Sequence, residues 1–165
     1  MRSVTIAALL TIGVCAPASA QTADAALMAP IQQFITSFNK GDVAGAAATH
    51  AAGADVTIID EVSPYIWRGP KAFLTWVADL DNDSKKNGIT EPMVTLSAAT
   101  RVEKNGDQAY VIVPAVYSYK QGGKAMREAA QMTVVLKKDA KGWLIHAWTW
   151  TGPKPRPAGG APIKK

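Results

Sequence analysis

Apolar residues recur at helical spacing in the first half of the chain. The first apolar stripe consists of Leu27, Ile31, Phe34, Ile35 and Phe38. Its spacing of three and four residues predicts an amphipathic helix, and Lys40-Gly41 supplies the basic residue and glycine that commonly end helices. Pro30 is predicted to lie near the start of this helix, where a missing N–H is tolerated.

Two further helices are predicted before most of the strands. Asp42 is placed to cap a short helix that runs to about His50, because its carboxylate accepts the free N–H groups of a first helical turn. This gives Asp42 a structural rather than a catalytic role. Gly69-Pro70 opens the third helix, with proline near the first helical position. The predicted inward face of that helix comprises Phe73, Trp76, Val77 and Leu80.

Alternating segments rich in β-branched residues predict the strands. A short one covers residues 55–60, and longer ones cover 93–102, 108–120, 125–138 and 143–151. Asn105-Gly106 is a hairpin signal between the first two long segments. Pro114 cannot donate to a ladder, so a bulge or a sheet edge is predicted there. Helices followed by hairpin-linked strands indicate an α+β fold.

Five short motifs occur in an order that resembles one known scaffold. They are Asn39-Lys40-Gly41-Asp42, a carboxylate on the first strand, Trp67-Arg68-Gly69 before a helix, Gly106-Asp107-x-Ala109, and Gly142-Trp143-x-Ile145. In this order they are similar to the nuclear transport factor 2-like superfamily, which includes SnoaL-like and ketosteroid-isomerase-like proteins. The resemblance implies a single cone-shaped domain over residues 24–152. In that fold three N-terminal helices pack inside a strongly curved, mostly antiparallel sheet.

The carboxylate of the first strand is Asp60. The resemblance to ketosteroid isomerase implies that Asp60 is a general base that moves a proton next to a carbonyl. Val56, Ile58 and Asp60 share one face by alternation, and apolar walls disfavour a charged carboxylate and make it more basic. The alternative is a solvent-exposed aspartate at the strand end, beside Glu61.

The other groups of that isomerase are not found at the matching positions. Phe34 stands where the isomerase pattern has a tyrosine, and the region around Gln131-Met132 has no acid. Each oxyanion donor contributes on the order of 3 kcal/mol to catalysis. Steroid isomerisation by that mechanism is therefore not expected.

Aromatic residues suggest what the cone interior binds. With Ile58 on the strand of Asp60, the residues expected to contact a ligand are Phe34, Ile58, Trp67, Trp76, Tyr117, Tyr119 and Trp150. The last strand leaves two alternatives open. Unbroken alternation from Ile145 would put Trp148 and Trp150 on the outer sheet face, where they would form a homodimer surface. A bulge would instead turn both into the pocket.

The sequence offers little for metal or cofactor chemistry. His50 and His146 are the two histidines and lie far apart in the sequence, so no metal site is predicted. His50 is interpreted as a surface residue, with a His50–Asp60 acid/base pair as the alternative. No nucleophile elbow, phosphate-binding glycine loop or zinc-ligand cluster occurs, and no cofactor is expected.

Both ends of the chain differ in composition from its body. Arg2, an apolar run over 4–14 and Ala18-Ser19-Ala20 predict a signal peptide over residues 1–20, cleaved after Ala20. We therefore expect a periplasmic or secreted protein that does not insert in the membrane and that loses Cys15, its single cysteine. Residues 153–165 are rich in proline, glycine and lysine and are expected to be disordered. Because residues 21–152 hold 13 basic and 13 acidic residues, the net charge of +5 predicts no nucleic-acid partner.

Three functions follow as hypotheses. The first is an exported module that binds an apolar or aromatic small molecule. The second is a cofactor-free isomerase, cyclase or dehydratase with Asp60 as its base. The third is an interaction domain with a filled cone that dimerises through its sheet.

Overall fold

The computed structural model describes residues 18–140 and 142–159. Most of the predicted signal peptide, including Cys15, and the end of the predicted tail lie outside these residues. The described part is an α+β fold of three helices and an eight-stranded mixed sheet. Within it, no helix is long and apolar enough to span a membrane.

The three helices follow the predicted order. They are α1 (Ala18–Asn39), α2 (Val43–Ala47) and α3 (Ala72–Asn87). Asp42 caps α2 as predicted, accepting a hydrogen bond from the Gly45 amide over 2.8 Å. One detail differs from prediction: because α1 starts at Ala18, Pro30 lies well inside it and not near its start. The helix α3 continues beyond its predicted inward face, through a polar stretch, to Asn87.

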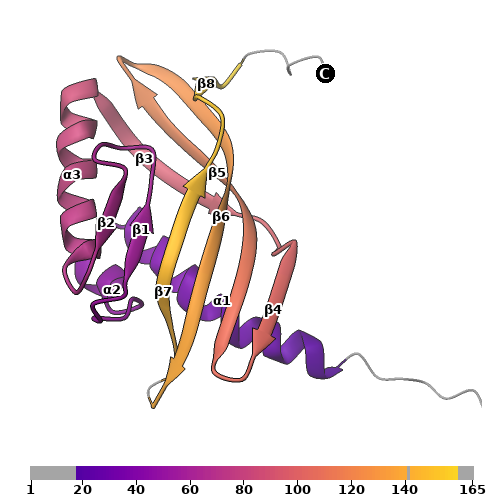
Figure 1. Cartoon of the computed structure of the whole chain (residues 1–165). Coiled ribbons are helices and arrows are strands. Elements are labelled where there is room, and N and C mark those ends of the chain that lie inside the picture. Colours follow the sequence, from indigo (N-terminus) through magenta and orange to yellow (C-terminus); the bar gives the residue numbers. More distant parts are fainter. Residues whose placement is uncertain (1–17, 141, 160–165) are drawn as a thin grey trace, which may run out of the picture.

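The strands form one sheet. They are β1 (Thr57–Ile59), β2 (Ile66–Arg68), β3 (Ile89–Leu96), β4 (Arg101–Asn105), β5 (Gln108–Gln121), β6 (Lys124–Asp139), β7 (Gly142–Thr151) and β8 (Arg156–Pro157). Their order is β2-β1-β7-β6-β5-β3, with β4 also on β5 and β8 on β6. All neighbours are antiparallel except β1 and β7. Figure 1 shows the long strands bending across the molecule, with α1 beside them and α3 near β1 and β2.

The segment predicted as one strand over 93–102 is divided in two. Both β3 and β4 pair with the same side of β5, and the gap between them falls opposite Pro114. The register of β5 with β6 is unbroken through Pro114, so the predicted bulge is absent from that pairing. The Ser97 amide donates to the Pro114 carbonyl. The N–H that proline lacks would point to the same side, where the ladder is already interrupted.

A bulge does occur on β7, at His146. Ile145 pairs with Leu136 and Ala147 pairs with Val135, so His146 is an extra residue on β7. The extra residue turns the following side chains over. Trp148 consequently faces the core, where 4 % of it is exposed. The dimer surface predicted from outward-facing Trp148 and Trp150 is thus wrong, and the alternative with a bulge is confirmed.

The first helix is tied to the sheet by the side chain of Asn39. Its Nδ2 donates to the Val94 carbonyl and its Oδ1 accepts from the Val94 amide, both over 2.8 Å. Asn39 therefore binds β3 as a neighbouring strand would. The first residue of the Asn39–Asp42 motif therefore has a structural role, which is to hold the end of α1 against β3.

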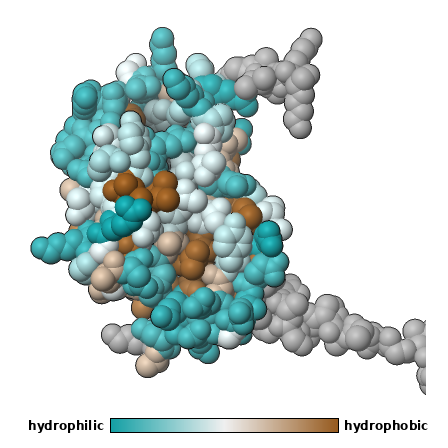
Figure 2. Space-filling view, viewed as in Figure 1, coloured by the Kyte–Doolittle hydropathy of each residue, from teal (hydrophilic) through white to brown (hydrophobic). Residues whose placement is uncertain are grey.

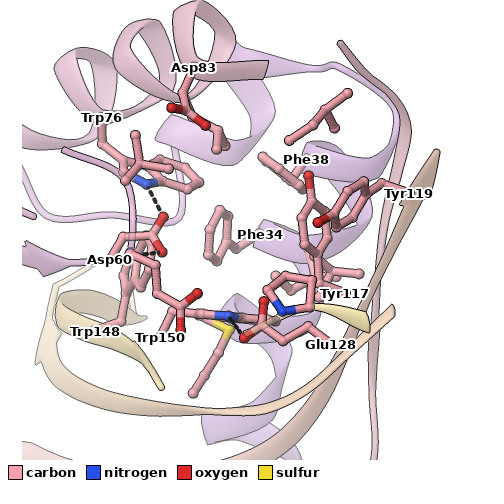
Figure 3. A pocket seen from close by; sticks show the side chains of 18 residues that line it. Phe34, Phe38, Asp60, Trp76, Asp83, Tyr117, Tyr119, Glu128, Trp148 and Trp150 are labelled. Atoms are coloured by element: carbon pink, nitrogen blue, oxygen red, sulfur yellow. Dashed lines mark hydrogen bonds between the residues drawn. The ribbon is translucent and has the colours of Figure 1, made fainter. Parts of the chain in front are cut away.

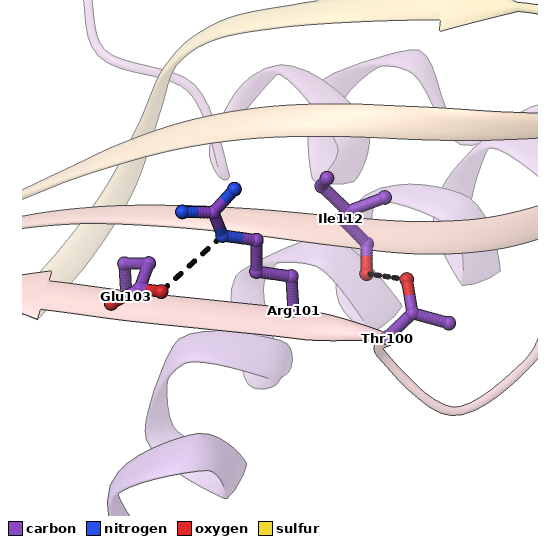
Figure 4. Close-up of polar contacts among 4 residues, drawn as sticks. All are labelled: Thr100, Arg101, Glu103 and Ile112. Carbon is purple, nitrogen blue, oxygen red and sulfur yellow. Dashed lines mark hydrogen bonds and ion pairs between the residues drawn. The ribbon is translucent and has the colours of Figure 1, made fainter.

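The core lies between the helices and the inner sheet face. Its largest fully buried side chains include Phe34, Leu27, Ile31, Ile58 and Met132. On the side shown in Figure 2, brown hydrophobic patches are surrounded by hydrophilic residues. The strand β4 carries charged residues, among them Arg101, whose Nε lies 3.3 Å from Glu103 Oε1 (Figure 4). Such charges discourage pairing with another chain at a sheet edge.

The predicted disordered tail is partly structured. Arg156 and Pro157 form β8 and pair with Arg127 and Met126 of β6. Residues 160–165 lie outside the described part.

Candidate functional site

A cavity of about 230 Å³ opens between the helices and the inner face of the sheet. Figure 3 shows Asp60 and Trp76 on one side, Tyr117 and Tyr119 across from them, and Phe34 between. We call this cavity the pocket. Its lining comprises Phe34, Ile35, Phe38, Asp60, Glu61, Val62, Trp76, Leu80, Asp83, Ile89, Val94, Tyr117, Tyr119, Glu128, Met132, Trp148, Trp150 and Pro155.

Asp60 lies directly after β1 and turns into the pocket. Its Oδ2 accepts a hydrogen bond from Trp76 Nε1 over 2.6 Å, and its Oδ1 accepts one from the Glu61 amide over 2.7 Å. Burial raises the pKa of the Asp60 carboxyl, although the two hydrogen bonds act in the opposite direction. Val56 and Ile58, on the same face of the strand, are buried. Asp60 is thus a positioned carboxylate whose basicity exceeds that of a free aspartate.

A second carboxyl group, Glu128 of β6, also lines the pocket. The side chain is only 3 % exposed, and its Oε1 accepts a hydrogen bond from Trp150 Nε1 over 2.8 Å. Burial raises the pKa of Glu128 to about 7, with further contributions from the charges of Glu61 and Asp60. Near neutral pH, Glu128 therefore exists in both protonated and ionised forms.

The chain at Gly152 passes very close to this carboxyl. A Cβ at position 152 would lie 1.9 Å from Glu128 Oε1 and 2.9 Å from the Ala130 Cβ. Glycine is required there for the close approach. The end of β7 thus helps to confine the Glu128 side chain.

Sequence analysis missed Glu128, although its position carried a signal. Inward-facing residues of β6 alternate, and Met132, Val134 and Leu136 are all buried. Glu128 falls on the same even-numbered face, and a charged residue on an apolar face is a candidate for function. Glu128 precedes Met132, the position expected from the isomerase pattern, by four residues, which is two periods of alternation on the same face.

Aromatic rings form much of the pocket wall. The ring of Phe34 lies 5.7 Å from that of Trp148 and 6.1 Å from that of Trp76. Tyr117 and Tyr119 lie 4.9 Å apart, centroid to centroid. Burial raises the pKa of Tyr117, and the nearby acidic groups raise it further. Its hydroxyl therefore stays protonated at neutral pH and is a hydrogen-bond donor.

The structure brings most of the predicted site residues together. Those that line the pocket are Phe34, Asp60, Trp76, Tyr117, Tyr119 and Trp150. Ile58 and Trp67 are not among the lining residues and are buried in the core. Trp67 Nε1 donates to Asp79 Oδ2 over 2.7 Å, which anchors β2 to α3.

His50 is a buried residue, so its interpretation as a surface histidine is wrong. It is 7 % exposed and lies 4.4 Å from Phe73, centroid to centroid. Its Nε2 accepts a hydrogen bond from Trp148 Nε1. Burial lowers the pKa of His50 to about 4. His50 does not line the pocket, and its hydrogen bonds are with Ala46, Thr49 and Trp148 rather than Asp60.

The ionisable side chains that line the pocket are acidic. Four carboxyl residues line it, and no lysine, arginine or histidine is present among the described lining residues. Across the described chain, no group of three histidine, cysteine, aspartate or glutamate residues is arranged to hold a metal ion. The pocket can accept protons and hydrogen bonds from a bound molecule through Asp60 and Glu128. It can donate hydrogen bonds through the tyrosine hydroxyls.

Comparison with protein families gives a match over most of the chain. The family model of the SnoaL-like domain matches residues 27–149. The chain belongs to this family. The resemblance to the nuclear transport factor 2-like superfamily is thereby confirmed.

Solved structures with the same fold are distant in sequence. A hexachlorocyclohexane dehydrochlorinase, LinA-type3, from Novosphingobium barchaimii has a TM-score of 0.69 at 15% identity, covering 91% of this chain and 99% of that one. A ketosteroid isomerase-like protein from Erwinia carotovora atroseptica has a TM-score of 0.60 at 18% identity, covering 79% and 96%. A superfamily protein from Salmonella enterica has a TM-score of 0.67 at 14% identity, covering 86% and 99%.

These similarities establish the fold alone. Comparison with curated protein sequences gives no significant match. Function must therefore be argued from the pocket itself.

Proposed function

We propose that this SnoaL-like domain binds a small molecule with an apolar or aromatic body in the pocket. The observation that carries the proposal is a cavity of about 230 Å³ walled by aromatic rings, beside a buried hydrophobic core. Pockets of this kind, with a few polar groups on an apolar wall, are typical of ligand sites. This cavity does not support the third hypothesis, in which side chains fill the interior of the cone.

The tryptophan indoles allow this proposal to be tested at individual residues. We would record the indole N–H resonances by NMR while titrating a set of aromatic fragments. Trp76, Trp148 and Trp150 line the pocket, whereas Trp67 and Trp143 do not. A ligand in the pocket should shift the first three resonances and leave the other two nearly unchanged. Shifts confined to Trp67 or Trp143, or uniform shifts of all five, would contradict the proposal.

A pocket-filling variant gives a matched control. Val94 lines the pocket, whereas Val135 lies on the outer sheet face and is 38 % exposed. We expect Val94→Phe to weaken fragment binding by at least tenfold and Val135→Phe to leave it unchanged. Thermal unfolding of both variants would establish that they are folded.

A second candidate function is proton transfer, with Asp60 as general base. The raised pKa of Asp60 favours it, since an effective base has a pKa closer to the working pH. Tyr117 and the protonated form of Glu128 line the same pocket. The isomerase pattern requires a tyrosine and a neutral acid. Here Tyr117 and protonated Glu128 would supply these groups, in place of Phe34 and the region around Gln131-Met132. This supports a cofactor-free isomerase, cyclase or dehydratase as the alternative to a binding module.

Hydrogen exchange of a simple ketone would test the second candidate. We would follow deuterium uptake at the methyl group of acetophenone in D₂O, comparing the wild type with Asp60→Asn. Asparagine keeps an oxygen that accepts the Trp76 N–H but cannot take the proton. Enzyme-dependent exchange that disappears in this variant, with fragment binding retained, would support catalysis. Exchange that survives in Asp60→Asn would exclude Asp60 as the base.

Export is part of the proposal. The predicted signal peptide supports it, and the expected mature protein starts at Gln21. Intact-mass analysis of the protein from the periplasmic fraction or the medium tests this start site. A homodimer through the sheet would have to use outward-facing residues such as Tyr110 and Val135, which pair on β5 and β6. Native mass spectrometry would determine the number of subunits.

A further inference from the structure

The charge of the pocket identifies a class of ligand. Of the chain's 13 acidic residues, four line the pocket: Asp60, Glu61, Asp83 and Glu128. The chain as a whole carries a net charge of +5, so this concentration is not a consequence of an acidic composition. The absence of a basic side chain among the described lining residues leaves the carboxylates uncompensated within the pocket. A partly enclosed cavity with one sign of charge concentrates ligands of the opposite sign.

The tryptophans hold the two more buried carboxylates by their N–H groups. Trp76 donates to Asp60 over 2.6 Å, and Trp150 donates to Glu128 over 2.8 Å. With both indole N–H groups engaged, a ligand meets the carbon surface of each indole rather than its polar edge. The rings of Phe38, Tyr117 and Tyr119 add to this surface (Figure 3). Aromatic faces attract cations within about 6 Å of the ring centroid.

We propose that the pocket binds an organic cation, an amine or quaternary ammonium group on an apolar or aromatic body. This inference rests on the proposed binding function and assigns the chemical class of its ligand. The aromatic faces accommodate the body, and the carboxylates of Asp60 and Glu128 neutralise the charge. A neutral apolar ligand would displace water from these carboxylates without replacing its interactions, which costs free energy.

The protonation behaviour of the acids agrees with this assignment. Burial and neighbouring charge both raise the pKa of Glu61, and the same two causes act on Asp60 and Glu128. The carboxyl groups thus repel one another when they are ionised. A bound cation would relieve that repulsion. An inorganic metal ion is a poorer occupant, because no group of three ligands in the described chain is arranged to hold one.

A pair of isosteric probes tests the inference. Phenyltrimethylammonium and tert-butylbenzene have the same shape and differ in charge, because a carbon replaces the nitrogen in the second. We would titrate each into the wild-type protein and follow the indole resonances of Trp76 and Trp150. We expect the cation to bind at least tenfold more tightly than the hydrocarbon.

Three variants with the same change of charge complete the test. Glu128→Gln and Asp60→Asn should each weaken binding of the cation at least fivefold, whereas binding of tert-butylbenzene should not weaken, because an amide costs less to desolvate than a carboxylate. Glu103→Gln, on the exposed strand β4, should change neither affinity. The dispersion of the NMR signals shows whether each variant is folded. Because each carboxylate is tested by its own variant, the other variant still decides the question if one of them misfolds.

The outcomes separate this inference from the function on which it rests. Equal affinity for the two probes would overturn the cation assignment, as would equal losses of affinity for both probes in the charge variants. In either case, binding of tert-butylbenzene would still support a ligand pocket. If neither probe moved the indole resonances of Trp76 and Trp150, both the assignment and the binding function would fail. Selective binding of the cation that depends on Asp60 and Glu128 would support both.

Discussion

The indole Nε1–H of Trp148 donates a hydrogen bond to Nε2 of His50 over 3.1 Å. Since an indole nitrogen only donates, His50 Nε2 must be the unprotonated acceptor. The imidazole proton is then on Nδ1, which lies 3.0 Å from the Ala46 carbonyl and donates to it. A protonated imidazole would direct an N–H at the indole N–H. This contact therefore fixes a neutral tautomer and connects the segment after α2 to β7.

Trp148→Phe should destabilise the fold by about 1–3 kcal/mol, because it leaves the buried Nε2 of His50 without a donor. Loss of part of the indole ring adds a packing term. Urea unfolding at pH 7 measures the change. Trp143→Phe is the matched control at the partly buried start of β7 and should cost less. An equal loss for both variants would mean that ring size matters more than the hydrogen bond.

The stability of the protein should depend on pH through two buried groups that act in opposite directions. His50 has a folded pKa of about 4, below its unfolded value near 6.5, so its contribution is complete above pH 6.5 and is lost as the pH falls towards 4. Glu128 has a folded pKa of about 7, above its unfolded value near 4.5. Its burial therefore becomes more costly as the pH rises from 4.5 to 7. Between about pH 4.5 and 6.5 the two effects offset each other.

Glu128→Gln isolates the second effect. Glutamine retains an oxygen that accepts the Trp150 N–H but does not ionise. Relative to wild type, the variant should gain stability between pH 4.5 and pH 8, by at most about 3 kcal/mol and by less where water screens the site. Urea unfolding at both pH values measures the difference. Glu103→Gln, at an exposed position, serves as the control. Profiles of wild type and Glu128→Gln that run parallel would contradict the assigned pKa.

The bulge at His146 decides which face Trp148 and Trp150 occupy. Deleting His146 should remove the bulge and leave both indoles facing inward, because Ala147 already pairs with Val135, the neighbour of Leu136, and would then follow Ile145 directly. We expect a loss well below about 4 kcal/mol, because the buried indole of Trp148 and its hydrogen bond to His50 are retained. His146→Ala keeps the extra backbone residue and removes a side chain that is 20 % exposed and contacts exposed Asp55, so the bulge and both indoles should stay in place. Circular dichroism and urea unfolding test the pair. A loss of more than about 4 kcal/mol in the deletion variant, as expected when a buried indole is turned outward, would show that β7 shifts by one residue on β6 instead.

Local patterns in the sequence were sufficient to predict most elements. The stripe from Leu27 to Phe38 gave α1, and Asn105-Gly106 gave the β4–β5 hairpin, because periodicity and turn chemistry act over a few residues. Alternation also placed Asp60 on the face of Val56 and Ile58 correctly. These predictions needed no knowledge of distant contacts.

Features that depend on distant partners were not predictable in the same way. The parallel pairing of β1 with β7 joins residues 90 positions apart in the sequence (Ile58 opposite Trp148). Whether His146 is an extra residue depends on the register of β7 against β6. The burial of His50 depends on Trp148 reaching it from another element. Trp67 was expected in the pocket but satisfies its N–H on Asp79 of α3, a partner that its own sequence context does not reveal.

Asn39 should be required for docking α1 on β3. Asn39→Ala leaves the amide and the carbonyl of Val94 without their side-chain partners, and Val94 itself is 8 % exposed. We expect a loss of about 2 kcal/mol in urea unfolding, since each unmade hydrogen bond at a poorly solvated backbone group is costly. Asn39→Asp keeps the acceptor for the Val94 amide but lacks the donor for the Val94 carbonyl. The aspartate variant should therefore lose stability through the carbonyl alone, whereas the alanine variant leaves both backbone groups without a partner. In the aspartate variant the Val94 amide should remain protected from hydrogen exchange, whereas alanine should expose it. Retained protection in Asn39→Ala would show that α1 is docked by its apolar stripe alone.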